Sequence, residues 1–183
     1  MKKARITKDD IQNPAYERHV ALGWNYRMSD VVGAVALAQT ERMEELCDMR
    51  KAVGKIIEEG AKGCDWLIPQ YTPEECEHAY WAVAMRMANP DITWYDFRKK
   101  FMELGGDGIY SAWKLSYLEP AFRNKTFYGR EKLFDGYTYE EGLCPVAEMI
   151  QPQLLQFKTN YFDTDEAEAQ AEILRKTIAY FGK

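Results

Sequence analysis

The stretch GWNYRMSDVVGAVALAQTERMEELCDMRKAVG, residues 23–54, begins with a short polar motif and continues directly into a long helical pattern. From Ser29 to about Glu59, apolar side chains recur at intervals of three or four residues, which is the spacing of one face of an α-helix. The first turns carry Gly33 and several alanines. Small residues let another backbone approach closely, so this part of the helix is expected to pack tightly against something. Gly60 predicts its end.

The tetrad Asn25-Tyr26-Arg27-Met28 lies just before this helix. A guanidinium gives a charge-assisted fork, an amide gives a neutral donor, and a helix start adds exposed N–H groups, so the tetrad is suited to holding a phosphate. The alternative is an ordinary helix cap at Ser29 or Asp30 with a surface arginine in front of it. The tetrad alone favours this alternative, because such tetrads are common.

The remaining chain predicts an α+β fold, in which the long N-terminal helix leads into a small, mostly antiparallel three-stranded sheet covered by helices. The first 22 residues read as a polar, irregular arm, and residues 23–183 as one small domain. Strands are expected over 78–87, 108–113 and 154–158, with a shorter candidate at 65–68. Helices are expected over 93–104, 144–151 and 163–181. The segment 114–143 is expected to be irregular with short helices.

Composition indicates a cytoplasmic globular domain. The net charge is −5 with a pI near 5.2, and basic residues are spread along the chain, which argues against a nucleic-acid surface. No apolar run approaches the roughly 20 residues of a membrane span, and the first residues lack a signal-peptide pattern. The four cysteines form no C-x-x-C pair, so no metal site is expected, and four free thiols fit a reducing compartment.

Several motifs together resemble the DegT/DnrJ/EryC1/StrS sugar aminotransferases. The run 23–54 resembles the segment that follows the cofactor domain in that family. Three later segments also resemble family motifs: Glu77-His78-Ala79-Tyr80-Trp81, Leu104-Gly105-Gly106-Asp107-Gly108-Ile109 and Cys144-Pro145-Val146-Ala147-Glu148. The resemblance covers residues 16–182 but only the second half of the family's length. The positions of the first run that fit are Gly23, Asn25, Tyr26, Arg27, Met28, Gln39, Glu41 and Arg50.

The resemblance implies the C-terminal small domain of a fold-type I enzyme that uses pyridoxal phosphate to aminate a keto-sugar on a nucleotide carrier. Such chemistry needs a Schiff-base lysine and an acidic partner for the pyridine nitrogen, which in the family lie upstream of the tetrad. Here only Lys2, Lys3 and Lys8 lie upstream, in a polar run without an apolar strand. The chain is therefore expected to contain no catalytic residue of its own and to use the cofactor only with a catalytic domain that it lacks.

The resemblance also implies roles for individual residues. Asn25 would donate to the cofactor phosphate of a neighbouring subunit, with Tyr26 and Arg27 supporting the loop. This implies a homodimer, or pairing with a cofactor-bearing domain.

For the small-molecule sugar, the candidate substrate contacts are His78, Tyr110, Trp113 and Tyr117. Each has a structural alternative: a histidine at a strand edge is more often a surface or half-buried structural residue, and the aromatic residues fit a place in the core equally well. The segment after Ile109 also departs from the family, because it lacks the usual histidine there.

Two other functions remain open. The chain could be a non-enzymatic interaction module that kept the domain and lost the chemistry. It could also be an independent small enzyme with His78 or a cysteine as nucleophile. The second is weak, because no Cys/His or Ser/His/Asp grouping is recognisable in the sequence.

Overall fold

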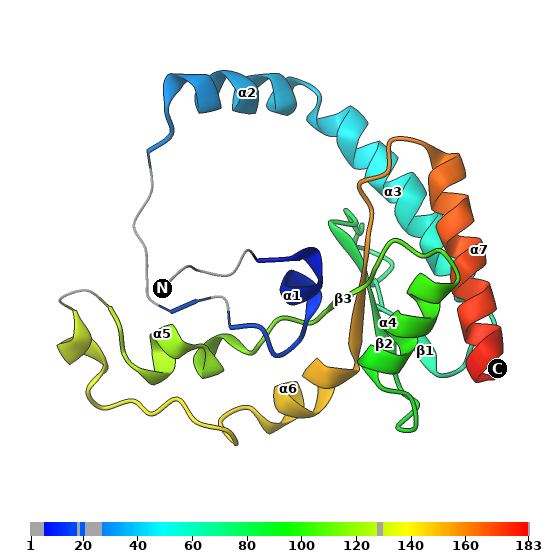
Figure 1. Ribbon diagram of the computed structural model, residues 1–183. Helices are drawn as coiled ribbons and strands as arrows, with labels where there is room; N and C mark the ends of the chain where they lie inside the picture. Colours follow the sequence, from blue (N-terminus) through cyan, green and yellow to red (C-terminus); the bar gives the residue numbers. More distant parts are fainter. Residues whose placement is uncertain (1–5, 18, 21–26, 128–129, 183) are drawn as a thin grey trace.

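The fold is centred on a small antiparallel sheet in a computed structural model that describes residues 6–17, 19–20, 27–127 and 130–182 (Figure 1). The sheet has the strand order β1-β2-β4-β3. Each of its three hydrogen-bonded pairs of strands is antiparallel. Val83 lies opposite Phe157, and Ser111 lies opposite Leu155. The strands are β1 (Leu67–Pro69), β2 (Ala82–Met87), β3 (Tyr110–Ser111) and β4 (Leu154–Lys158).

The prediction of three strands was wrong, because the short candidate at 65–68 also joins the sheet. Leu67 pairs with Met87 at the end of β2, and Ala88 N–H donates to the Trp66 carbonyl at 2.7 Å. Leu67 is fully buried. A strand of three residues is too short for a periodic signal, and its pairing with β2 stabilises it.

Three helices cover one side of this sheet and share its core (Figure 1). They are α3 (Met43–Gly60), α4 (Trp94–Glu103) and α7 (Thr164–Phe181). The predicted caps are present, because Thr93 accepts from Asp96 N–H and Asp163 accepts from Asp165 N–H. The core brings together Val53 and Ile57 of α3, Phe97 and Phe101 of α4, Ala171, Leu174 and Ile178 of α7, and Val83, Met85, Leu155 and Phe157 of the sheet.

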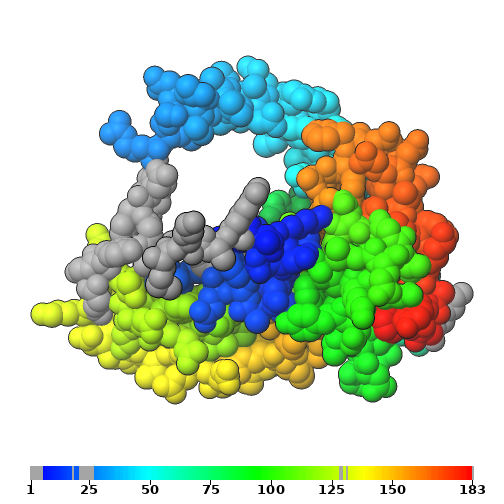
Figure 2. All heavy atoms as spheres, in the orientation of Figure 1, coloured from blue at the N-terminus to red at the C-terminus, as the bar shows by residue number. Residues whose placement is uncertain are grey.

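The long helix expected over 29–59 is two helices, α2 (Asp30–Glu41) and α3, with a break at Arg42. Arg42 has φ −105° and ψ 11°, outside helical values, and its guanidinium binds Glu45 with two hydrogen bonds. The expected tight packing of the first turns is also not found among the described residues, because α2 has no buried residue. Figure 2 shows open space between α2 and the body of the molecule.

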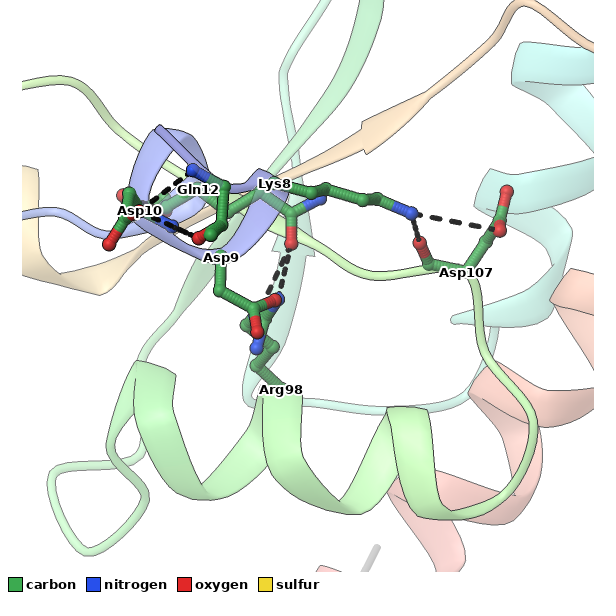
Figure 3. A network of polar contacts seen from close by, with 8 residues as sticks. Lys8, Asp9, Asp10, Gln12, Arg98 and Asp107 are labelled. Atoms are coloured by element: carbon green, nitrogen blue, oxygen red, sulfur yellow. Dashed lines mark hydrogen bonds and ion pairs between the residues drawn. The ribbon is translucent and has the colours of Figure 1, made fainter. Parts of the chain in front are cut away.

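The N-terminal arm is not wholly irregular, because it contains the short helix α1 (Lys8–Gln12). Thr7 and Asp10 form a capping box at its start. Figure 3 shows how Arg98 of α4 reaches the Gln12 amide oxygen and the Asp9 carboxylate. The Gln12 carbonyl also accepts from the Ser111 hydroxyl at 2.9 Å, so α1 covers the edge strand β3.

The segment between β3 and β4 is irregular with short helices, as expected. They are η1 (Ser116–Leu118), α5 (Pro120–Arg123), η2 (Glu131–Phe134), α6 (Pro145–Ile150) and η3 (Gln151–Gln153). Phe122, Phe127, Phe134 and Tyr139 pack there as a separate aromatic cluster. Within the described part of the chain, no helix has both the length and the apolar character that crossing a bilayer requires.

Candidate functional site

A hollow of about 370 Å³ lies on the sheet face opposite the core, where α1 and α3 meet the strands. The side chains of β4 alternate, so Leu155 and Phe157 are buried in the core while Gln156 and Lys158 are only partly buried and line the hollow. Its lining is Ile11, Arg50, Trp81, Ala82, Tyr110, Trp113, Gln156, Phe157, Lys158, Thr159 and Asn160.

A second hollow of about 400 Å³ lies between the β2–α4 loop and η3, but its lining has no charged side chain. The first hollow combines charged groups, indole rings and strand ends. It is therefore the better candidate site.

The chain enters β2 through a strained residue beside the hollow. Tyr80 has a φ of 49°, which is uncommon for any residue other than glycine. Its ring rests on Gly54, its hydroxyl donates to Glu58 at 2.9 Å, and its N–H donates to the His78 ring at 2.7 Å. Burial, together with the hydrogen bond to Glu58 and the charge of Glu58, raises the pKa of the Tyr80 hydroxyl to about 12. Strain held by so many contacts is a feature of functional sites.

Arg50 of α3 ties this strained turn to the end of β4. Its Nη1 donates to the Thr159 hydroxyl at 3.0 Å and to the Trp81 carbonyl at 3.3 Å. Thr159 is buried, and its hydroxyl lies 2.6 Å from the Tyr80 carbonyl. No carboxylate lies within ion-pair distance of Arg50 among the residues placed by the structure. Among the described residues, the guanidinium is thus held in the wall by neutral acceptors alone.

Two indole rings belong to the apolar part of the lining. Trp81 and Trp113 lie edge to face with ring centroids 6.5 Å apart. Trp81 is 71% exposed, although it stands beside the buried Tyr80. A tryptophan that is this exposed next to a polar hollow offers a flat surface for a ring-shaped ligand.

Lys158 is the cation on the β4 side, and unlike Arg50 it has a counterion. Its ammonium contacts the Asp107 carboxylate, which also lies 3.9 Å from Lys8 of α1 and accepts from the Tyr161 hydroxyl at 3.2 Å. Burial lowers the pKa of the Lys158 ammonium, the charge of Lys8 lowers it further, and Glu166 raises it. The direct contact with Asp107 also favours the charged form of Lys158.

The structure brings together two of the four predicted substrate residues, Tyr110 and Trp113, in the lining of the hollow. His78 does not line it; the His78 ring packs on Tyr80 and accepts from its N–H. Tyr117 lies elsewhere and donates to Glu148, which also accepts from Gly142 N–H at 2.8 Å.

The predicted cofactor residues Asn25 and Tyr26 lie outside the described residues, and Arg27 is exposed just before α2. Sequence reasoning did not select Trp81, Lys158 or Thr159 as site residues. Arg50 was noted only for its fit to the family pattern. Trp81 lies directly before β2 and Thr159 directly after β4. These positions at strand ends were the available sequence signal for a site.

The described residues give no support to a metal site or a thiol nucleophile. They contain no group of three His, Cys, Asp or Glu side chains placed to hold a metal ion. Cys76 and Cys144 are exposed and Cys47 and Cys64 are partly buried, all as free thiols. The His78 ring is engaged by Tyr80 and by Gln70 at 3.4 Å, and no cysteine is among its contacts there.

Comparison with solved structures identifies the fold. The chain is similar to 3-amino-5-hydroxybenzoic acid synthase, with a TM-score of 0.62 and 16% identity over 93% of this chain and 45% of that one. It is similar to GDP-4-keto-6-deoxymannose-3-dehydratase, with a TM-score of 0.57 and 14% identity over 86% and 38%. A sugar aminotransferase from Micromonospora echinospora gives a TM-score of 0.54 and 14% identity over 84% and 37%.

The chain thus spans less than half the length of these three proteins. A search of the curated proteins finds no match. The sequence model of one family matches residues 3–172, nearly the whole chain. The chain therefore belongs to the DegT/DnrJ/EryC1/StrS aminotransferase family.

Proposed function

We propose that this chain is the C-terminal part of a cytoplasmic, pyridoxal-phosphate-dependent aminotransferase that aminates a keto-sugar carried on a nucleotide. The family match over residues 3–172 is the observation that carries the proposal. The fold agrees with it, because the small sheet and its covering helices align with part of longer enzymes of this type. In this proposal residues 1–22 form an arm and residues 23–183 the small domain.

The residues of the chain would serve a site completed by another domain. Asn25 would donate to the cofactor phosphate of a neighbouring subunit, with Tyr26 and Arg27 supporting that loop. Tyr110 and Trp113 would contact the sugar, since both line the hollow. His78 would act by positioning Tyr80, and Tyr117 by fixing the loop that Glu148 binds.

The described residues do not fit the covalent attachment of pyridoxal phosphate. A Schiff-base lysine must lose its proton, and it does so most readily in an apolar pocket or beside another cation. Lys158 is the lysine that lines the hollow, and burial and the charge of Lys8 lower the pKa of its ammonium. The Asp107 carboxylate, however, is in direct contact with this ammonium and favours its charged form. Bond formation to the cofactor is therefore assigned to a separate cofactor-bearing domain, and this chain would position the substrate.

Helix α2 is the proposed surface for that domain or for a second copy of the chain. Between Met28 and Ala38, Asp30 is the only ionisable side chain. Val31 is 76% exposed and Val35 60% exposed, and no residue of α2 is buried. An apolar helix that is bare on all sides is typical of an interface or an aggregation-prone surface.

Replacing Val31 and Val35 with glutamate is expected to shift the chain from dimer or larger species toward monomer, with little loss of folding. Both side chains are exposed, so the replacements remove apolar contact between molecules without opening the core. Sedimentation velocity of the wild type and the double variant measures this. A monomeric wild type that binds no hydrophobic dye would contradict the prediction.

The alternative is a non-enzymatic interaction module derived from this domain. The contact between Lys158 and Asp107 favours this module, because it keeps the amine in the lining of the hollow charged and unreactive. Reading the DNA upstream of Met1 for an open reading frame with a lysine in an apolar strand, and co-expressing its product with this chain, separates the two functions. The aminotransferase proposal predicts a stable complex that aminates keto-sugars and loses activity with Asn25→Ala. A complex without activity, or no complex at all, would favour the module.

A further inference from the structure

We propose that residues 7–12, the strap, which contain α1, detach from the domain as a unit while the sheet, α4 and α7 stay folded. The hinge is the turn at Asn13-Pro14. Because α1 forms part of the wall of the hollow, detachment opens the hollow on that side, and the strap controls access to it. The inference concerns a movement of this chain and does not rest on the reaction proposed for the site.

Polar contacts hold the strap to α4 and to the loop between α4 and β3 (Figure 3). Arg98 binds the Asp9 carboxylate at 2.6 Å and the Gln12 amide oxygen at 2.6 Å and 3.0 Å. Lys8 donates to the Asp107 carbonyl at 2.5 Å and lies 3.9 Å from the carboxylate of the same residue. The side chains of Lys8 and Asp9 are 55% and 73% exposed. Ion pairs with partners this exposed add little stability and weaken as the salt concentration rises.

Little apolar surface supports this attachment. Ile11 is the one apolar side chain of α1, and it is 42% exposed. Among the described residues, the core cluster includes none from α1. Gln12 is the buried residue of α1, and its Nε2 has no hydrogen-bond partner within the described part of the chain. A buried donor without an acceptor opposes docking, because water can satisfy that donor once the strap is released.

The strap is also too short to stay helical once it is released. Helix α1 has five residues, and helices shorter than about 12 residues are marginal in water. Its backbone hydrogen bonds, such as the one from Ile11 N–H to the Thr7 carbonyl at 3.2 Å, therefore depend on docking. Release and unwinding are one event, so the backbone amides of the strap report directly on its detachment.

The chain beyond the strap is fixed, which places the hinge at the turn between them. His19 N–H donates to the carboxylate of Glu119 at 3.3 Å, and Glu119 is fully enclosed by the fold. The His19 carbonyl accepts from the N–H of buried Ala121 at 2.8 Å. The Asn13-Pro14 turn lies between the strap and these anchors. Movement on the strap side of the turn leaves the anchored part of the arm in place.

The strap is linked to the hollow in two ways. Ile11 belongs to the lining, so release removes that part of the wall. Lys8 shares the Asp107 carboxylate with Lys158, which also belongs to the lining. Release of the strap therefore changes both the shape of the hollow and the charges around Lys158.

The test is amide hydrogen exchange of the purified chain, measured by mass spectrometry on peptides from the strap, α4 and α7 at low and at high sodium chloride concentration. We expect the strap amides to exchange about tenfold faster at high salt, because hydrogen bonds to charged groups hold the strap and salt screens those charges. The amides of α4 and α7 should keep their exchange rates.

Variants then assign the attachment to Arg98. Arg98→Met removes the contacts with Asp9 and Gln12 and keeps an unbranched stem beside Trp94, so at low salt the strap amides should exchange about tenfold faster. Arg175→Met is the matched control, since it removes an exposed ion pair within α7. Circular dichroism checks folding. If Arg98→Met does not fold, Asp9→Asn tests the same contact from its exposed side.

The side-chain amide signals of Gln156 and Asn160 in two-dimensional NMR report on the hollow, because both residues line it. These signals should shift in Arg98→Met and stay in place in Arg175→Met. Three results would overturn the inference: strap amides that exchange only together with those of α7, strap exchange that responds neither to salt nor to Arg98→Met, or unmoved Gln156 and Asn160 signals in Arg98→Met. None of these measurements needs pyridoxal phosphate or a second domain.

Discussion

Leu174→Ala is expected to lower the free energy of unfolding by about 2–5 kcal/mol. Leu174 is fully buried on the face of α7 that also buries Ala171 and Ile178. Removing its isobutyl group loses apolar burial and leaves a cavity, because α7 is held closely against α3 and cannot collapse freely. The closeness is visible at Gly60, where a methyl group would come within 3.1 Å of Ala171.

Lys176→Ala is the matched control on the same helix. Its side chain is 60% exposed and forms an ion pair with Glu172 at 3.7 Å, an exposed contact of small value. The change should alter stability by about 0.5 kcal/mol or less. Urea unfolding followed by circular dichroism gives both values. Equal losses for the two variants would mean that the wrong face of α7 has been assigned to the core.

Gly54→Ala is expected to destabilise the chain by about 1–3 kcal/mol through overpacking. A methyl group at this position would lie 2.3 Å from the Cδ1 and Cγ atoms of the Tyr80 ring. The ring cannot move aside easily, because Glu58 holds its hydroxyl and His78 holds the backbone N–H of the same residue. Displacing Tyr80 would also disturb the Trp81 carbonyl that Arg50 binds.

Gly33→Ala in α2 provides the opposite case. The nearest atom to a new methyl group there would be the Met28 sulfur at 3.9 Å, an ordinary contact. Alanine is favoured over glycine within a helix by about 0.5–1 kcal/mol, so this variant should be neutral or stabilised. Thermal unfolding of both variants compares them directly. If Gly54→Ala were stabilised as well, the close contact between α3 and Tyr80 would be wrong.

Helices α4 and α7 and strands β2 and β4 could be predicted because each carries its own local signal. Thr93 and Asp163 mark the helix starts, and Val83, Met85, Leu155 and Phe157 alternate with less buried residues. Such signals arise within a few residues along the chain. They predict an element whatever it packs against.

The missed features depend on contacts between distant segments. Helix α1 has only five residues, and Arg98 and Ser111 hold it in place. The apolar pattern of 29–59 continues across Arg42, so periodicity alone could not reveal that the helix breaks there. The first half of that pattern looks buried in the sequence because it is apolar, yet the described chain contains no surface that covers it.

The candidate site was predictable only in part for the same reason. Tyr110 and Trp113 were selected as aromatic residues after a family motif, and both line the hollow. Arg50 is far from both in sequence, and no local pattern shows that it reaches Thr159 and the Trp81 carbonyl beside them. The positive φ of Tyr80 and the buried hydroxyl of Thr159 occur where the start of β2 lies beside the end of β4, a contact between distant segments.

The central proposal is that this chain would shape a substrate site for an aminotransferase without supplying the lysine that binds the cofactor. The most direct measurement adds pyridoxal phosphate to the isolated chain, records the absorption spectrum, reduces with borohydride and maps the labelled peptides. The account predicts weak labelling spread over exposed lysines, with Lys158 protected by its contact with Asp107. A stable absorption band with stoichiometric labelling of one lysine, at Lys158 or elsewhere, would contradict it.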